Sequence, residues 1–217
     1  MEEVLEVYHR PFDPENPVVA MDEQPIQLIR DTRPIISSQP ANNGHAAHPE
    51  RVDYEYERNG TACVFMFVAP FLNWRRVSVR EHRTKWDTAE ELERLVMHDF
   101  KAAKKVTIIW DNLNTHTKGM LYKRFQPEYC REILRRCEFI PTPVHGSWLN
   151  VAECELSVLT KQCLCGRIGS MDEVRKQVVA WMAWRNHHAK GVHWQFTTHD
   201  ARIKLNSVYP KFHFDNE

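Results

Sequence analysis

Two stretches of this sequence share one pattern: Val106-Thr-Ile-Ile-Trp110 runs directly into Asp111, and Pro17-Val-Val-Ala-Met21 runs directly into Asp22. A short apolar run bounded by polar residues is typical of a buried strand in an α/β protein. We therefore predict two buried strands that each end in a carboxylate. If these strands are neighbours in one sheet, Asp22 and Asp111 meet at the same edge.

The sequence between these two runs predicts a hairpin and a further antiparallel strand. Apolar residues alternate with acidic ones over 52–57, which is the period-two pattern of a half-buried strand. The dipeptide Asn59-Gly60 is expected to turn the chain into a returning strand over 62–68, and a third strand is expected over 74–79. The segment 30–49, rich in Pro, Ser, Asn and His, is expected to form a long surface connection.

Helices are expected over 88–104, 127–136 and 147–164, a brief strand at 139–140, a long helix from Ser170 and a short one over 198–209. Thr88 with Glu91 has the pattern of a capping box, and Ser147 is the expected N-cap of the helix that carries Glu153. This order predicts an α/β fold with a ribonuclease H-like mixed sheet, three antiparallel strands followed by parallel ones, flanked by helices. We expect one domain over 1–217, with a core over 17–164 and a helical extension over 165–217.

Composition narrows the classes of protein that fit. The chain has 217 residues, and its 29 basic and 29 acidic side chains give a formal net charge of zero, so it is not a wholly basic nucleic-acid binder. Its six cysteines form no CxxC pair, which argues against a zinc site or a disulfide framework. With no secretory signal and no apolar run long enough for a membrane span, we expect a cytoplasmic protein that does not contact membranes.

The acidic residues at the strand ends suggest metal chemistry. Mg²⁺ prefers oxygen ligands, keeps several waters and is usually held by a few carboxylates together with the phosphate of a substrate. Asp22 and Asp111 would supply two such ligands, and Glu153, on a helix packed beside the sheet, would supply a third. For any one of these acids taken alone, a solvated surface residue or a local cap is the competing interpretation.

Several motifs resemble one family of enzymes. Asp111-Asn-Leu-Asn-Thr-His116 and His145-Gly-Ser-Trp-Leu-Asn-Val-Ala-Glu153 closely resemble the second and third acidic motifs of mariner-related insertion-sequence transposases, and Val18-Val-Ala-Met-Asp-Glu23 resembles the first. The segments 54–61 and 200–205 are similar to framework segments of the same family, the group typified by insertion sequence 630. The resemblance covers nearly the whole chain.

The resemblance implies a DDE-type transposase that hydrolyses a phosphodiester at the transposon end and then joins a 3′-hydroxyl to target DNA. Asp22, Asp111 and Glu153 would be both catalytic and metal-binding, and would hold two Mg²⁺ ions, with Mn²⁺ as a substitute. Six further motif residues would either fix the loops around these acids or contact DNA; they are Glu23, Asn112, Asn114, His116, His145 and Asn150.

Family members also carry an N-terminal helix-turn-helix region, whereas this sequence begins just before the first acidic motif. The expected partner is therefore double-stranded DNA held mainly by its backbone, with a homodimer or a separate recognition module supplying specificity. Four basic groups are candidate phosphate contacts or ordinary solvated faces: Arg75 with Arg76, Lys101 with Lys104 and Lys105, Lys118 with Lys123 and Arg124, and Arg131 with Arg135 and Arg136. Two other functions stay open: a catalytically silent remnant that regulates transposition, and a ribonuclease H-like nuclease acting on hybrid or branched substrates.

Overall fold

The fold is built around one five-stranded mixed sheet. A computed structural model describes residues 1–42, 46–144, 146–188, 191–192 and 194–209. The sheet has the order β3-β2-β1-β4-β5 and consists of β1 (Val18–Asp31), β2 (Tyr56–Ala69), β3 (Trp74–Arg80), β4 (Val106–Trp110) and β5 (Cys137–Pro141). β2 runs antiparallel to both β1 and β3, whereas β4 runs parallel to both β1 and β5. The predicted mixed sheet, with β1 beside β4, is therefore confirmed.

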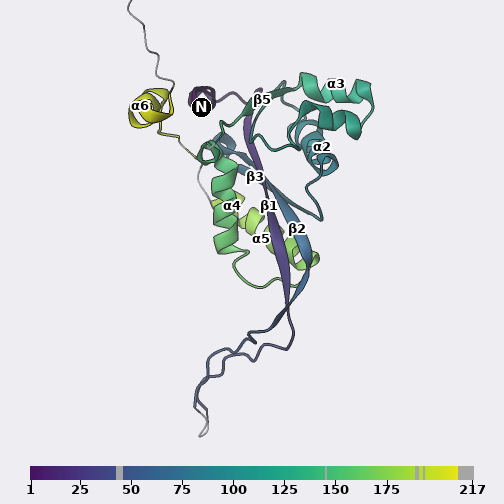
Figure 1. The fold of residues 1–217 in the computed structure, drawn as a ribbon, viewed down its shortest axis with the longest axis vertical. Helices are drawn as coiled ribbons and strands as arrows, with labels where there is room; N and C mark the ends of the chain where they lie inside the picture. The colour runs from purple at the N-terminus through teal and green to yellow at the C-terminus, as the bar shows by residue number, and fades with distance from the viewer. Residues whose placement is uncertain (43–45, 145, 189–190, 193, 210–217) are drawn as a thin grey trace, which may run out of the picture.

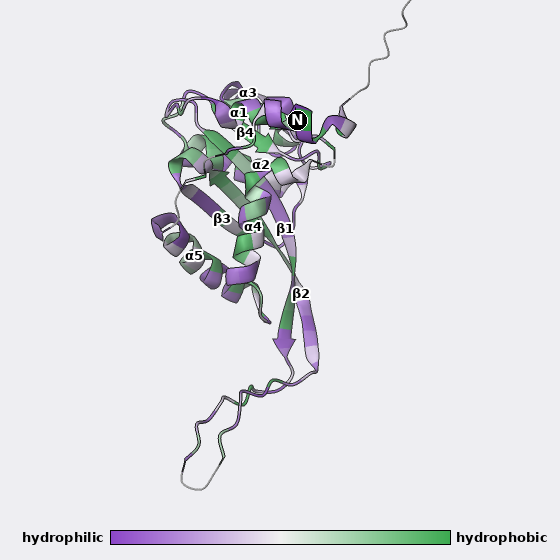
Figure 2. Cartoon of the chain, turned by 90° about the vertical axis from the view of Figure 1, so that its left-hand side faces the viewer, coloured by the Kyte–Doolittle hydropathy of each residue, from purple (hydrophilic) through white to green (hydrophobic). Residues whose placement is uncertain are grey.

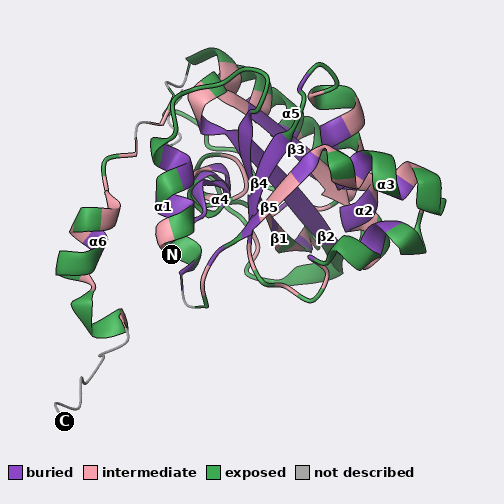
Figure 3. Cartoon of the chain, turned by 90° about the horizontal axis from the view of Figure 1, so that it is seen from above, coloured by how far each residue is buried: buried purple, intermediate pink, exposed green. Residues whose placement is uncertain are grey.

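Helices cover both faces of this sheet (Figures 1 and 3). One face packs against α1 (Glu2–His9), α4 (Val151–Gln162) and α5 (Met171–His188), and the other against α2 (Lys85–Arg94) and α3 (Pro127–Arg135). The short helix α6 (Thr198–Lys204) lies against α1. The sequence pattern gave no sign of α1, whose four buried residues join the core.

The side chains of β1 alternate between the two hydrophobic cores. Val18 and Ala20 join the core beneath α4, whereas Val19 and Met21 join the core beneath α2. This period-two division continues past the apolar residues, because successive side chains of a strand point to opposite faces. It places Asp22 on the α4 side and Glu23 on the α2 side.

The expected hairpin at Asn59-Gly60 is wrong. β1 and β2 pair with each other along a long ribbon that leaves the core, and 32–42 and 46–55 form an extended excursion beyond it (Figures 1 and 2). Gly60, with φ of +87°, lies inside β2 where the pairing register shifts, so this Asn-Gly pair accommodates a β-bulge in place of a turn. Of the alternating residues of 52–57, only Tyr56 and Glu57 belong to β2; 52–55 lie in the excursion, where Tyr54 is 84% exposed.

Two expected helix starts also differ from the structure. The N-cap of α2 is Thr84, which forms a capping box with Asp87, while Thr88 is a buried residue of the first turn. Ser147 begins a 3-10 helix, η4 (Ser147–Leu149), and Asn150 is the N-cap of α4. In both cases the N-cap is the residue whose side chain accepts a hydrogen bond from a free backbone N–H of the first turn.

Two further features of the fold concern the cysteines and the helices. Of the six cysteines, all free, Cys63, Cys130 and Cys137 are buried, whereas Cys154 and Cys165 are exposed. Among the described residues, no helix combines the length and the apolar character that crossing a bilayer requires.

Candidate carboxylate site

Asp22, Asp111 and Glu153 come from three different elements and line one pocket with a volume of about 490 Å³. Asp111 directly follows β4, as predicted, but Asp22 lies inside β1, which continues to Asp31. The pairing of β1 with β4 stops at Ala20 and Ile109, so Asp22 lies just past the region where β4 covers β1. Its side chain can thus face an open pocket although its backbone stays paired to β2 at Met66.

Asn150 fixes the position of Glu153 relative to β1. Its side-chain amide donates a hydrogen bond to the carbonyl of Met21 over 2.9 Å, and its side-chain oxygen accepts one from the Ala152 N–H over 3.1 Å. Asn150 is 1% exposed, so both bonds are protected from water. Glu153 then lies in the first turn of α4 with an exposed side chain. The sequence motif had indicated a role for Asn150 in fixing loops or contacting DNA, without revealing its contact with β1.

His116 joins two of the candidate acids. Its Nδ1 lies 2.6 Å from Oδ1 of Asp111, and its Nε2 lies 3.1 Å from Oε2 of Glu23, while the imidazole stacks on Trp110 at 5.2 Å between ring centroids. The side chains of His116 and Glu23 are 0% and 1% exposed. Although burial lowers the pKa of His116, the hydrogen bonds and charges of the two carboxylates raise it to about 10. A charged imidazolium therefore holds Asp111 beside β1.

The acids of the pocket differ in their electrostatic surroundings. Burial, together with the charges of Asp111, Glu23 and Glu153, raises the pKa of Asp22 to about 7, against a partial lowering by the Glu23 N–H. Burial also acts to raise the pKa of Asp111, but His116 and the Leu113 N–H hold it below its ordinary value. Among the described residues, Asp22 therefore has no positive partner and is repelled by the neighbouring carboxylates, and a bound cation would relieve this repulsion.

These residues fit a hard divalent metal by the chemistry of the donor set. The described residues that line the pocket offer carboxylate oxygens without sulfur or imidazole, which suits Mg²⁺ or Mn²⁺. Buried Oε1 of Glu23 has no hydrogen-bond partner in the described structure. Within the described ranges, no three His, Cys, Asp or Glu side chains are gathered into a ready-made metal centre. Mg²⁺ sites that take further ligands from water and substrate phosphate need only a few protein carboxylates. Binding here would require the carboxylate oxygens of the pocket to converge on the ion.

The other predicted site residues have varied positions. Asn112 donates to the Thr142 carbonyl over 2.5 Å and so ties the loop after β4 to the end of β5, whereas Asn114 is exposed. His145 lies outside the described residues. The structure also shows Ser157 and Lys161 of α4 at the pocket wall. Helical periodicity from Glu153 would have found both, because they follow it at four and eight residues.

Three members of the basic groups have structural roles. Arg75 pairs with buried Glu155, Arg76 pairs with buried Glu91, and Arg136 donates to the carbonyls of Phe100, Lys101 and Ala103. Their charges are used within the fold, so the first and last groups contribute less to a DNA surface than the sequence suggested. Buried cations need such partners, which are invisible in the local sequence.

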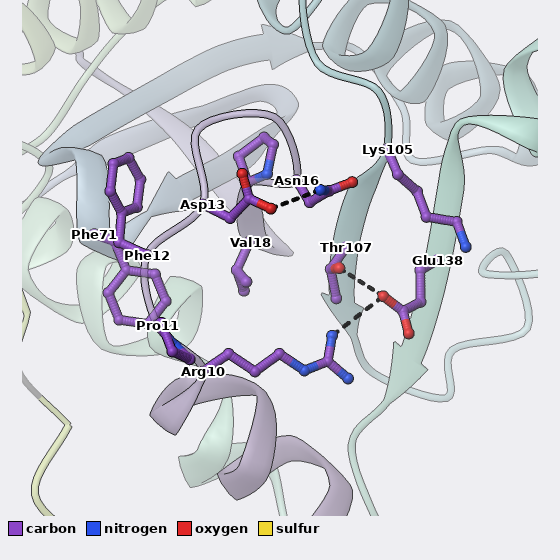
Figure 4. A pocket seen from close by; sticks show the side chains of 11 residues that line it. Arg10, Pro11, Phe12, Asp13, Asn16, Val18, Phe71, Lys105, Thr107 and Glu138 are labelled. Carbon is purple, nitrogen blue, oxygen red and sulfur yellow. Dashed lines mark hydrogen bonds and ion pairs between the residues drawn. The ribbon is translucent and has the colours of Figure 1, made fainter.

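A second pocket, of about 350 Å³, lies at the opposite end of β1 and β4 (Figure 4). Its acids are engaged locally: Glu138 accepts hydrogen bonds from Thr107 and Arg10, and Asp13 accepts one from Asn16. It therefore lacks the mutually repelling carboxylates that distinguish the pocket at Asp22.

The strand order and the flanking helices are those of a ribonuclease H-like domain, and comparison with known proteins agrees. Residues 17–175 match the family described as DDE superfamily endonuclease, which spans all three acids, and the chain belongs to this family. No curated protein matches the chain.

Solved structures support the fold. The Mos1 strand transfer complex is similar with a TM-score of 0.53 and 16% identity, over 86% of this chain and 55% of that one. The Mos1 mariner paired end complex with Mn gives a TM-score of 0.53 and 17% identity, over 86% and 56% of the two chains. The paired end complex with Mg gives a TM-score of 0.53 and 15% identity, over 97% and 62%. This chain thus spans little more than half of the Mos1 chain in the first two structures.

Proposed function

We propose that this chain is the catalytic core of a DNA transposase of the mariner-related insertion-sequence type, in the group typified by insertion sequence 630. The observation that carries the proposal is the meeting of Asp22, Asp111 and Glu153, from three elements, in one pocket. Membership of the DDE superfamily endonucleases supports it, as does the likeness to Mos1 structures described as a strand transfer complex and as paired end complexes.

Asp22, Asp111 and Glu153 would hold two Mg²⁺ ions, with Mn²⁺ as a substitute. Bound there, the metal would activate the attacking oxygen and neutralise charge on the phosphoryl group. The chain itself contributes rigidity, because β1 and β4 fix the two aspartates and Asn150 fixes α4 to β1. His116 holds the Asp111 carboxylate in one orientation, so this metal-binding group is already ordered before the substrate binds.

The substrate would be double-stranded DNA, first at a transposon end and then at a target. The reaction is hydrolysis of a phosphodiester, followed by attack of the freed 3′-hydroxyl on a target phosphodiester, which releases one target 3′-hydroxyl for each new bond. We propose that recognition of the ends is provided by a homodimer or by a separate recognition module, and that this chain holds DNA mainly by its backbone.

The decisive experiment offers the purified chain a pre-cleaved transposon-end duplex and a target plasmid with Mg²⁺ or Mn²⁺. We expect metal-dependent joining that disappears in Asp111→Asn. Joining that persists in this variant, or that needs no divalent metal, would overturn the proposal. Equal DNA binding by both proteins without cutting or joining would instead indicate a silent regulatory remnant, and cleavage of RNA-DNA hybrids without joining would indicate a ribonuclease H-like nuclease.

A further inference from the structure

A groove separate from the carboxylate pocket lies between the segment 82–87 and the 3-10 helix η3 (Lys118–Lys123). It has a volume of about 480 Å³ and shares no lining residue with the carboxylate pocket. Its walls are His82, Thr84, Trp86, Asp87, Glu90, Lys123 and Arg124. The packing of α2 against η3 holds the two walls together.

Trp86 is the main apolar group of this groove. Its residue surface is 60% exposed, and in the described part of the chain its ring has no aromatic partner and its indole N–H no hydrogen bond. A single exposed hydrophobic residue is ordinary on a protein surface. An unpartnered indole that forms the wall of a groove containing cations is, however, the arrangement on which unpaired bases stack.

The charges of the groove favour an anionic occupant. Both acids are already satisfied, because Asp87 accepts from the backbone and hydroxyl of Thr84, and Glu90 pairs with Arg80 and Arg124. Lys123 has no side-chain hydrogen bond or ion pair within the described residues, and the same holds for Arg83 and Lys85, which flank Thr84. Among the described residues, Lys123 is thus an unpaired cation in the groove lining, and Arg83 and Lys85 are two more beside it in the chain.

Both walls start at the end of the sheet that carries the acids. β3 ends at Arg80, whose partner in β2 is Cys63, and Cys63 pairs with Pro25 of β1 shortly after Asp22. η3 follows the loop that leaves Asp111. A DNA strand bound in the groove would therefore continue toward the carboxylate pocket.

We propose that this groove holds an unpaired nucleotide of the DNA substrate, with its base stacked on Trp86 and the neighbouring phosphates bound by Lys123 and Arg83. The inference rests on the proposed function and extends it, because it assigns the chain a preference for DNA that is single-stranded or splayed beside the reacting phosphodiester. Stacking on an aromatic ring is tolerant of sequence, so the preference is for an unpaired base of any identity.

The test compares two fluorescent duplexes, identical except that one ends in a short single-stranded overhang, by anisotropy in EDTA so that no chemistry takes place. Trp86→Ala is expected to weaken binding of the overhang duplex about tenfold and to leave the blunt duplex unchanged. Trp86→Phe should restore binding close to that of the wild-type chain. The matched control is Trp184→Ala, since Trp184 is 52% exposed on α5, at the other face of the sheet.

A second variant keeps the inference testable if Trp86→Ala folds poorly. Lys123→Gln should lower the dependence of log affinity on log salt concentration by about 0.7 to 0.9 for the overhang duplex. Equal binding of both duplexes by the wild-type chain, equal effects of Trp86→Ala and Trp184→Ala, or a change of oligomeric state in Trp86→Ala without a change in DNA binding would each overturn the inference. Binding is measured without metal, so it can be judged apart from catalysis. If the wild-type chain never joins DNA but Trp86→Ala still weakens binding of the overhang duplex, the transposase proposal fails and the groove assignment stands.

Discussion

The side-chain amide of Asn150 lies 2.9 Å from the carbonyl oxygen of Met21, and this hydrogen bond fastens the start of α4 to the strand that carries Asp22. The same side chain caps α4 through the Ala152 N–H. One buried residue therefore sets the distance between the helix that bears Glu153 and the strand that bears Asp22.

Asn150→Ala should lower both stability and joining activity. Loss of the cap and of the bond to Met21 is expected to reduce the free energy of unfolding by about 1–2 kcal/mol, measured by urea denaturation. Asn150→Asp keeps the acceptor and should recover the cap but not the contact with Met21. Ser147→Ala is the control, because Ser147 makes no capping hydrogen bond. Unchanged stability in Asn150→Ala would contradict the assigned role.

Glu153 and Glu155 provide a matched pair on the same helix. Glu153→Gln should abolish joining, by more than about a hundredfold, with little effect on stability, because this exposed side chain would act through the metal. Glu155 is buried between Arg75 and Arg185. Glu155→Gln should reduce the free energy of unfolding by about 3 kcal/mol, because it leaves buried Arg75 without its counter-charge. The opposite result for the two variants would show that the wrong glutamate had been assigned to the site.

Removing the imidazole of His116 should weaken metal binding. His116→Ala is expected to shift the Mg²⁺ concentration needed for half-maximal joining upward about 10- to 100-fold, since Asp111 loses the group that orients it. His98→Ala is the control, because His98 is exposed and lies in the π-helical turn after α2, outside the lining of the carboxylate pocket. A variant that is less stable but has an unchanged Mg²⁺ requirement would limit His116 to a structural role.

Stability should fall in acid partly because of Glu91. Burial acts to raise its pKa, but the charges and hydrogen bonds of Arg76 and Arg80 hold it below the ordinary value of 4.5. A folded-state pKa below the unfolded one means that the stabilisation is present above about pH 4.5 and is lost as the pH falls through the folded-state value. Urea midpoints measured from neutral pH downward should therefore decline less steeply in Glu91→Gln than in the wild-type chain. The exposed Glu132→Gln should follow the wild-type curve, and coincident curves for all three would refute the prediction.

The features that could be predicted were those with a local cause. The apolar run of 106–110 predicted β4 correctly, since a fully buried strand needs nothing but apolar residues. The turn predicted at Asn59-Gly60 failed because its outcome depends on which strand pairs with β2, and β1 proved long enough to pair through it. The cap assigned to Ser147 failed for a similar reason, because Asn150 reaches both the helix and Met21.

For the site, the sequence by itself determined the donor chemistry: carboxylates placed after apolar runs, at Asp22 and Asp111, and a glutamate in a motif of its own at Glu153. Only the tertiary structure decided how these acids are held. The ion pair of His116 with Glu23, and the bond from Asn150 to Met21, join residues that are 93 and 129 positions apart in the chain. Such contacts depend on strand order and helix docking, which arise from packing the whole core, and no local pattern records them.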